Sequence, residues 1–153
     1  MVYEIPGQGS LELKTIILDL NGTISVNGGL VVGVHERLAK LKKAGYKIVL
    51  FTGNTRGDAD SIATQLGIEW IQAKGAEDKK NEALKLEPET CVSIGNGRID
   101  LELMQTVKLR IVTLQAEGVH VQTLLASDVV VQNINDALDM LIDQNILIAT
   151  LRH

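Results

Sequence analysis

Three short segments of small, oxygen-bearing residues each follow an apolar run of the sequence. They are Asp19 to Thr23, Thr52 to Thr55 and Gly95 to Asp100. Ligands of open α/β sheets bind at the carboxyl ends of the strands, so these segments are where chemistry is expected. If the apolar runs are neighbouring parallel strands, the three segments converge on one edge of the sheet.

The residue types in these segments suit phosphoryl transfer. A carboxylate at a strand end can attack phosphorus and form an aspartyl-phosphate, which makes Asp19 the candidate nucleophile. A threonine hydroxyl and backbone N–H groups at a loop-to-helix junction can bind phosphoryl oxygens. We assign this role to Thr52, with Gly53 and Asn54 as substrate-binding residues.

A hard cation would neutralise the remaining negative charge of such a site. Mg²⁺ takes oxygen ligands in near-octahedral geometry, and carboxylates, amides and backbone carbonyls provide them. The candidate metal ligands are Asp19, the backbone carbonyl of Asn21, Asn96 and Asp100. A lysine would complete the phosphate clamp, and Lys79 and Lys80 open the predicted helix that leads into the apolar run at Cys91.

The elements that must position these residues are indicated by apolar runs and helical periods. Five runs rich in Ile, Val and Leu predict buried strands at Thr15–Leu18, Lys47–Phe51, Cys91–Ile94, Leu109–Thr113 and Asp128–Val131. Helical periods run from Val34 to Leu41, Ala59 to Leu66, Ile99 to Val107 and Ile134 to Ile142. This alternation predicts a three-layer, Rossmann-like α/β fold with a parallel sheet flanked by helices.

Two segments depart from that alternation and predict β-hairpins. An N-terminal hairpin is expected over Tyr3–Leu13, around Pro6-Gly7-Gln8-Gly9, and a flap hairpin over Ile24–Val32, around Asn27-Gly28-Gly29. The rest of the chain up to Lys79 has room for helices and one short strand only. No cap domain is therefore expected.

Composition bounds the class of protein. With 153 residues, 45% apolar residues and a net charge of −4, the chain is expected to form one domain over residues 1–153. The acidic balance and 3% aromatic content argue against nucleic-acid binding. Neither an export signal nor the run of about 18 apolar residues that spans a membrane is present. The single Cys91 makes the cytoplasm the expected compartment.

In order and type, these motifs resemble those of the haloacid dehalogenase superfamily of phosphotransferases, over Thr15 to Val131. Ile5-Pro6-Gly7 and the Gly95-Asn96-Gly97 loop resemble its soluble, capless, P-type-ATPase-like members. The resemblance implies that Asp19 is the nucleophile, Thr52 the phosphate-binding hydroxyl and Asp100 the late acid that orients the cation or its waters. It also implies a clamp lysine: helix periodicity favours Lys80, whereas overall spacing favours Lys79.

Two positions differ from the superfamily pattern. Asn21 stands where the general acid/base is usually Asp, and an amide cannot transfer that proton, which is worth about 10²- to 10⁴-fold in rate. Asn96 stands where an acid usually binds Mg²⁺, so weak Mg²⁺ binding that phosphate strengthens is expected.

The sequence thus predicts a slow, Mg²⁺-dependent phosphatase or phosphoryl-transfer hydrolase that works through an aspartyl-phosphate on Asp19. Without a cap, its phosphorylated substrate is expected to be large or extended, or a partner subunit serves as the lid. Homo-oligomer formation is therefore left open. The alternative is a catalytically impaired, regulatory module that binds phosphate or a partner.

Overall fold

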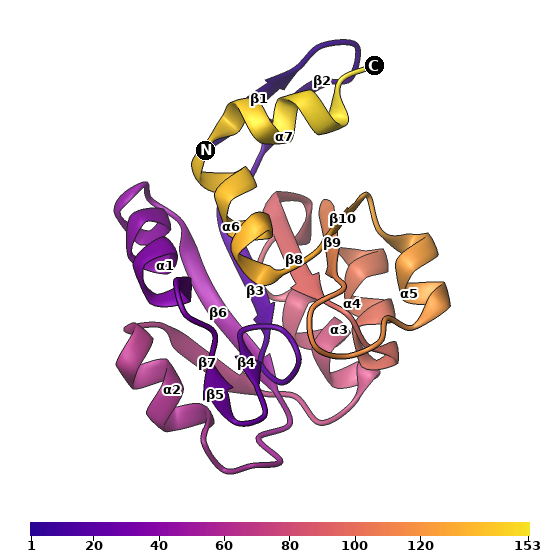
Figure 1. Ribbon diagram of the computed structural model, residues 1–153. Coiled ribbons are helices and arrows are strands. Elements are labelled where there is room, and N and C mark those ends of the chain that lie inside the picture. The colour runs from indigo at the N-terminus through magenta and orange to yellow at the C-terminus, as the bar shows by residue number, and fades with distance from the viewer.

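The computed structural model describes residues 1–153 and is built around a six-stranded parallel sheet (Figure 1). In spatial order the strands are β10 (Val129–Val131), β9 (Leu109–Thr113), β8 (Cys91–Gly95), β3 (Thr15–Asp19), β6 (Lys47–Thr52) and β7 (Glu69–Gln72). All neighbours pair in parallel. The three-layer α/β prediction is confirmed, and β7 is the short strand expected before Lys79.

The unbroken apolar runs arise because the central strands are buried on both faces. Along β3, Ile16 and Leu18 pack into the larger core cluster, and Ile17 between them packs into the smaller one. Val49 and Phe51 of β6 join Ile17 in the smaller cluster. Alternate residues of a strand point to opposite faces, so both faces demand apolar side chains.

Helices cover both faces of the sheet (Figure 1). The larger core cluster is closed by α1 (Val34–Lys43), α2 (Ala59–Leu66) and α6 (Ile134–Ile142), and the smaller by α3 (Ala76–Leu84) and α4 (Leu101–Thr106). The short α5 (Val121–Ala126) packs against α4 and β9. Single 3₁₀ turns stand at Pro88–Thr90 and Arg98–Asp100. None of the helices has the length and apolar character needed to cross a membrane.

Helix boundaries differ from the sequence predictions at several points. α3 begins at Ala76, so Lys79 lies within its first turn and does not open it. α4 begins at Leu101, because the residues from Arg98 form a 3₁₀ turn. The helical periods also gave no indication of α5 or of α7 (Gln144–Leu151).

Both predicted hairpins are present. The flap hairpin pairs β4 (Ser25–Val26) with β5 (Gly29–Leu30), and its turn residues Asn27 and Gly28 both have positive φ, as a two-residue hairpin turn requires. It follows β3 directly and lies at the carboxyl ends of the strands (Figure 1). No domain is inserted there, so the fold is capless as predicted.

The N-terminal hairpin of β1 (Val2–Ile5) and β2 (Gly9–Glu12) lies beside α7 at the opposite end of the sheet (Figure 1). Its anchor is the buried Tyr3, whose hydroxyl donates to the Leu141 carbonyl at 2.9 Å and pairs with the Tyr46 hydroxyl. Leu141 is in the last turn of α6, where carbonyls lack helical partners. Tyr3 therefore ties the hairpin to α6 and to the start of β6.

This anchor predicts different effects for two similar substitutions. Tyr3→Phe leaves the buried Leu141 carbonyl without its donor and should lower the free energy of unfolding by about 1–3 kcal/mol. Tyr46→Phe keeps the bond from Tyr3 to Leu141 and should cost less. Urea unfolding of both variants checks the order, and equal losses would contradict the role given to Tyr3.

Candidate active site

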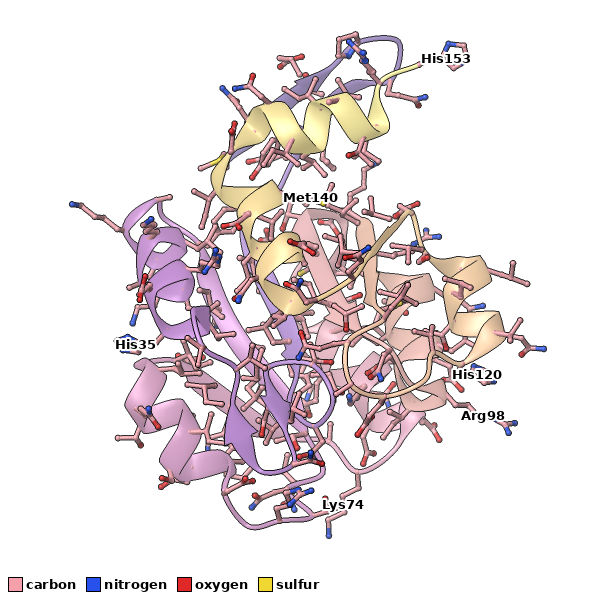
Figure 2. The ribbon with its side chains drawn as sticks, in the orientation of Figure 1. His35, Lys74, Arg98, His120, Met140 and His153 are labelled. Atoms are coloured by element: carbon pink, nitrogen blue, oxygen red, sulfur yellow. The ribbon has the colours of Figure 1, made fainter.

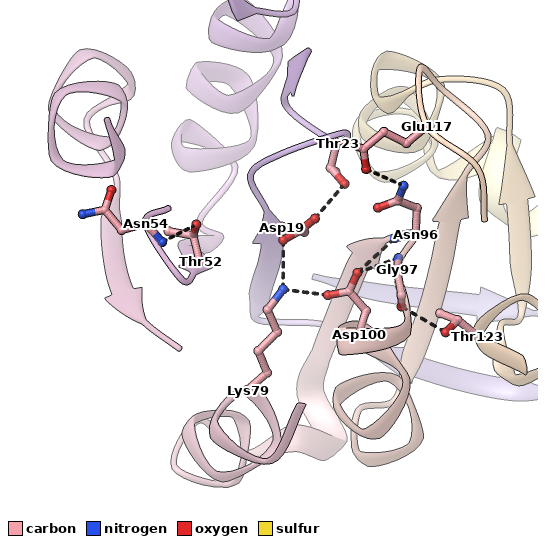
Figure 3. A network of polar contacts seen from close by, with 10 residues as sticks. All are labelled: Asp19, Thr23, Thr52, Asn54, Lys79, Asn96, Gly97, Asp100, Glu117 and Thr123. Carbon is pink, nitrogen blue, oxygen red and sulfur yellow. Dashed lines mark hydrogen bonds and ion pairs between the residues drawn. The ribbon is translucent and has the colours of Figure 1, made fainter. Parts of the chain in front are cut away.

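The three segments singled out in the sequence meet at the carboxyl ends of β3, β8 and β6, where β3 is the central strand of the three (Figure 3). Asp19 is the last residue of β3, Thr52 the last of β6, and Asn96 follows β8. The parallel register thus brings together residues that are far apart in the sequence.

A buried lysine joins two carboxylates at the centre of this site. Lys79 Nζ lies 2.9 Å from Asp19 Oδ1 and 2.7 Å from Asp100 Oδ1. The side chains of Lys79 and Asp100 are each 1% exposed and that of Asp19 is 14% exposed. The next residue, Lys80, is exposed, because successive residues of a helix point in directions about 100° apart. Of the two candidate lysines, only Lys79 reaches the carboxylates.

Asp100 holds the loop that follows β8. Its Oδ2 accepts hydrogen bonds from the backbone N–H groups of Asn96 at 3.1 Å and Gly97 at 3.0 Å, and its Oδ1 accepts the bond from Lys79. A Cβ at Gly95 would run into the Asp100 carboxylate, so glycine is required there. Asp100 was predicted from the sequence as a metal ligand. In the structure its carboxylate already accepts hydrogen bonds from three donors, which are Lys79 and the N–H groups of Asn96 and Gly97.

Asp19 keeps one oxygen largely free. Its Oδ2 has only a long contact, 3.5 Å, from the Thr23 hydroxyl. Burial and the neighbouring Asp100 raise the pKa of Asp19 to about 6, against the opposing effect of Lys79. Burial alone would discharge Lys79, but Asp100 and Asp19 outweigh it and raise the pKa of the lysine. Oδ2 of Asp19 is therefore the carboxylate oxygen at the centre of the site that has the fewest contacts within the chain.

The Thr52 loop contributes a hydroxyl and backbone groups to the site, but not the Asn54 side chain. Thr52 Oγ1 accepts from the Asn54 N–H at 3.1 Å, which leaves the hydroxyl proton free to donate. Asn54 Oδ1 accepts from the Ala59 N–H at the start of α2, and its side chain points away from Asp19 in Figure 3. The N–H of Gly53 donates no hydrogen bond within the chain.

The oxygen donors fit a hard divalent cation. The backbone carbonyl of Asn21 and the amide oxygen of Asn96 accept no hydrogen bond within the chain, and Figure 3 shows that amide oxygen on the side facing Asp19. No three His, Cys, Asp or Glu side chains are grouped to hold a metal. Mg²⁺ commonly takes one or two carboxylates and completes its shell with waters and substrate phosphates. Asp19, Asn21 and Asn96 would hold it.

Sequence reasoning missed one loop of the site, residues 114–120 between β9 and α5. Its Glu117 and Gly118 contact the Asn96 side chain, and its Gln115 donates to the Thr23 carbonyl at 2.9 Å. The signal was available, because this loop follows the predicted strand Leu109–Thr113 and carries a carboxylate.

The buried lysine predicts opposite outcomes for two adjacent residues. Lys79→Met leaves the Asp19 and Asp100 carboxylates without their cation and should lower the free energy of unfolding at neutral pH by about 3–5 kcal/mol. Lys80→Met changes an exposed residue and should stay within about 0.5 kcal/mol of wild type. Denaturant unfolding measures the stability of both variants. Similar losses of stability in the two variants would show that the ion pairs of Lys79 do not provide it.

The raised pKa of Asp19 predicts how stability changes with pH. A carboxyl whose pKa rises from 3.8 to about 6 on folding binds its proton more tightly in the folded state. Protonated Asp19 therefore stabilises the folded state at low pH. This stabilisation, of up to about 3 kcal/mol, is lost as the pH rises from about 4 to about 6.

Comparison of metal-free wild type with Asp19→Asn isolates this contribution, because all other groups titrate in both proteins. The wild type should lose stability relative to the variant as pH rises through this window. A difference that stays constant from pH 4 to pH 7 would contradict the shift.

The chain is similar in sequence to two archaeal proteins. A soluble P-type ATPase-like phosphatase of Methanocaldococcus jannaschii is 29% identical over 145 residues, covering 90% of this chain and 53% of the relative. An uncharacterised protein of the same organism is 46% identical over 61 residues, covering 40% of this chain and 66% of that protein. The chain thus spans about half of the first relative and just under two thirds of the second.

No protein-family model matches the chain, but solved structures share its fold. The 3-deoxy-D-manno-octulosonate 8-phosphate phosphatase of Moraxella catarrhalis, solved with magnesium and phosphate ions, superimposes with a TM-score of 0.69 at 21% identity, covering 92% of this chain and 94% of the other. The cobalt-bound deoxy-D-mannose-octulosonate 8-phosphate phosphatase of Haemophilus influenzae gives 0.72 at 16% identity, with 90% and 89% covered. Further neighbours are named as hydrolases of the haloacid dehalogenase family. The chain therefore has the fold of haloacid dehalogenase-family hydrolases and is similar in sequence to a soluble P-type ATPase-like phosphatase.

Proposed function

We propose that this chain is a slow, Mg²⁺-dependent phosphohydrolase that forms an aspartyl-phosphate on Asp19. The observation that carries the proposal is the Lys79 ammonium between Asp19 and Asp100, which engages one oxygen of Asp19 and leaves the other free at the strand end. The similarity to a relative named as a phosphatase supports the same reaction class.

The first half-reaction moves the phosphoryl group to the enzyme. Asp19 Oδ2 forms a bond to phosphorus while the bond between phosphorus and the substrate oxygen breaks. The substrate oxygen leaves with the electron pair of that bond and takes a proton from water. Asn21, beside the nucleophile, has an amide and cannot supply that proton.

The second half-reaction returns the enzyme to its starting state. A water oxygen bonds to phosphorus, the bond between phosphorus and Asp19 breaks, and the carboxylate is regenerated as phosphate leaves. The proton of this water passes to the solvent, because Asn21 stands in the first loop in place of a carboxylate that could accept it. General acid–base catalysis contributes about 10²- to 10⁴-fold, so the phosphoenzyme should be long-lived.

The remaining residues hold the transferring group. The free proton of the Thr52 hydroxyl and the free N–H of Gly53 can donate to phosphoryl oxygens. Lys79 places positive charge beside the attacking carboxylate. When bound, Mg²⁺ would supply further positive charge to offset that of the phosphoryl group. Because the fold is capless, we expect phosphorylated substrates that are large or extended, or a second subunit that covers the site.

A phosphorylation assay tests the proposal. Full-length protein is incubated with p-nitrophenyl phosphate or acetyl phosphate, with and without Mg²⁺, and intact-mass measurement follows the gain of one phosphoryl group. The adduct should require Mg²⁺, react with hydroxylamine and be absent from Asp19→Asn. If neither adduct nor phosphate release occurs but phosphate still binds, the chain is the binding module and the proposal fails.

A second variant tests why turnover is slow. Asn21→Asp restores a carboxylate beside the nucleophile and should accelerate phosphate release by about 10²- to 10⁴-fold while the adduct accumulates less. Asn145→Asp makes the same chemical change at an exposed position at the start of α7 and is the matched control. If the rate of phosphate release is unchanged in Asn21→Asp, the amide at this position is not the cause of slow turnover.

A further inference from the structure

The loop of residues 114–120 is held against the site from both sides. On one side Gln115 Nε2 donates to the Thr23 carbonyl at 2.9 Å, and Gln115 Oε1 accepts from the Ile134 N–H at 2.7 Å. On the other side the N–H of His120, the residue before α5 that is labelled in Figure 2, donates to the Asn96 carbonyl at 3.0 Å. The loop therefore bridges the segment after β3 and the segment after β8, and Glu117 lies between these two anchors.

The Glu117 carboxylate lies against the Asn96 amide and the backbone of Gly22. Asn96 Nδ2 lies 3.4 Å from Glu117 Oε2 and donates to the Gly118 carbonyl at 3.2 Å (Figure 3). Gly22 has φ of +76°, and a Cβ there would run into the Glu117 carboxylate. Glycine at this position allows the carboxylate to reach the first loop.

These contacts leave the amide oxygen of Asn96 without a hydrogen-bond partner in the chain. Asn96 is 3% exposed, and both of its contacts to the loop use the amide nitrogen, so the amide oxygen has no partner. Figure 3 shows that oxygen directed to the Asp19 side. An amide oxygen without a donor is free to bind a ligand with positive charge.

The charges at the site point to a divalent cation. Lys79 pairs with both Asp19 and Asp100, so these three groups sum to one negative charge when all are ionised. Glu117 forms no ion pair in the chain and adds a second negative charge beside Gly22 and the Asn96 amide. A 2+ ion between Asp19 and Asn96 would balance them.

We propose that Glu117 provides the second carboxylate of the cation site, in place of the acid that is absent at Asn96. Glu117 can bind the cation directly or accept a hydrogen bond from a water that the cation holds. Both modes need only a carboxylate oxygen beside Asn96. The inference rests on the proposed function, because it takes Asp19 and Asn96 as holders of the cation. It adds a loop and a residue that the site motifs do not contain.

Direct cation binding tests the inference without an activity measurement. Mn²⁺ is used as a probe, and its free concentration is followed by electron paramagnetic resonance with phosphate-free, full-length protein. Glu117→Gln should raise the Kd for Mn²⁺ by about 10-fold or more, as the loss of a supporting carboxylate typically does. Glu89→Gln, the same change at an exposed residue before the amino end of β8, should leave Kd unchanged.

Two further variants separate the possible failures. Asn96→Asp in the Glu117→Gln background returns the carboxylate and should restore affinity. Asp19→Asn should abolish binding. If Asp19→Asn abolishes binding and Glu117→Gln does not weaken it, the cation site stands and the role of Glu117 is overturned. If neither change affects Kd, Mn²⁺ binds elsewhere, which overturns both this inference and the cation site of the proposed function.

Discussion

The buried ammonium of Lys79 is the constraint on which the site depends. A charge removed from water must be paired, and Lys79 meets that demand with two carboxylates, one at the end of β3 and one in the 3₁₀ turn that follows β8. Asp100 in turn depends on the residues around it. Asp100 can approach only because Gly95 has no side chain, and its second oxygen then binds the loop after β8. The position of that loop, including Asn96, thus follows from one buried ion-pair cluster.

The same constraint explains how the chain distributes its structure between the two ends of the sheet. At the amino ends, the N-terminal hairpin and α7 pack onto the core and are anchored through Tyr3. At the carboxyl ends, the flap hairpin and the loop of residues 114–120 lie beside the loops that follow β6 and β8. Additional packing is therefore placed where it cannot obstruct the candidate site, and the Asp19 edge remains accessible.

Much of the fold could be predicted because its central strands must be apolar on both faces, which produces unbroken runs such as Ile16 to Leu18. The choice between Lys79 and Lys80 could not be made from the sequence. One residue turns a helix by about 100°, and α3 has few buried residues to define its inner face. The direction of the Asn54 side chain depends on capping α2, which spacing does not reveal.

The amides at Asn21 and Asn96 affect the net charge of the site as well as its acid–base chemistry. Burial and the neighbouring Asp100 already raise the pKa of Asp19 to about 6, against the opposing effect of Lys79. A neighbouring carboxylate raises the pKa of a carboxyl group, so aspartates at these two positions would act in the same direction in the absence of a cation. A nucleophile must be ionised to attack phosphorus. Neutral amides at Asn21 and Asn96 limit the number of negative charges in the segments around Asp19, which favours the ionised form of its carboxyl group at neutral pH.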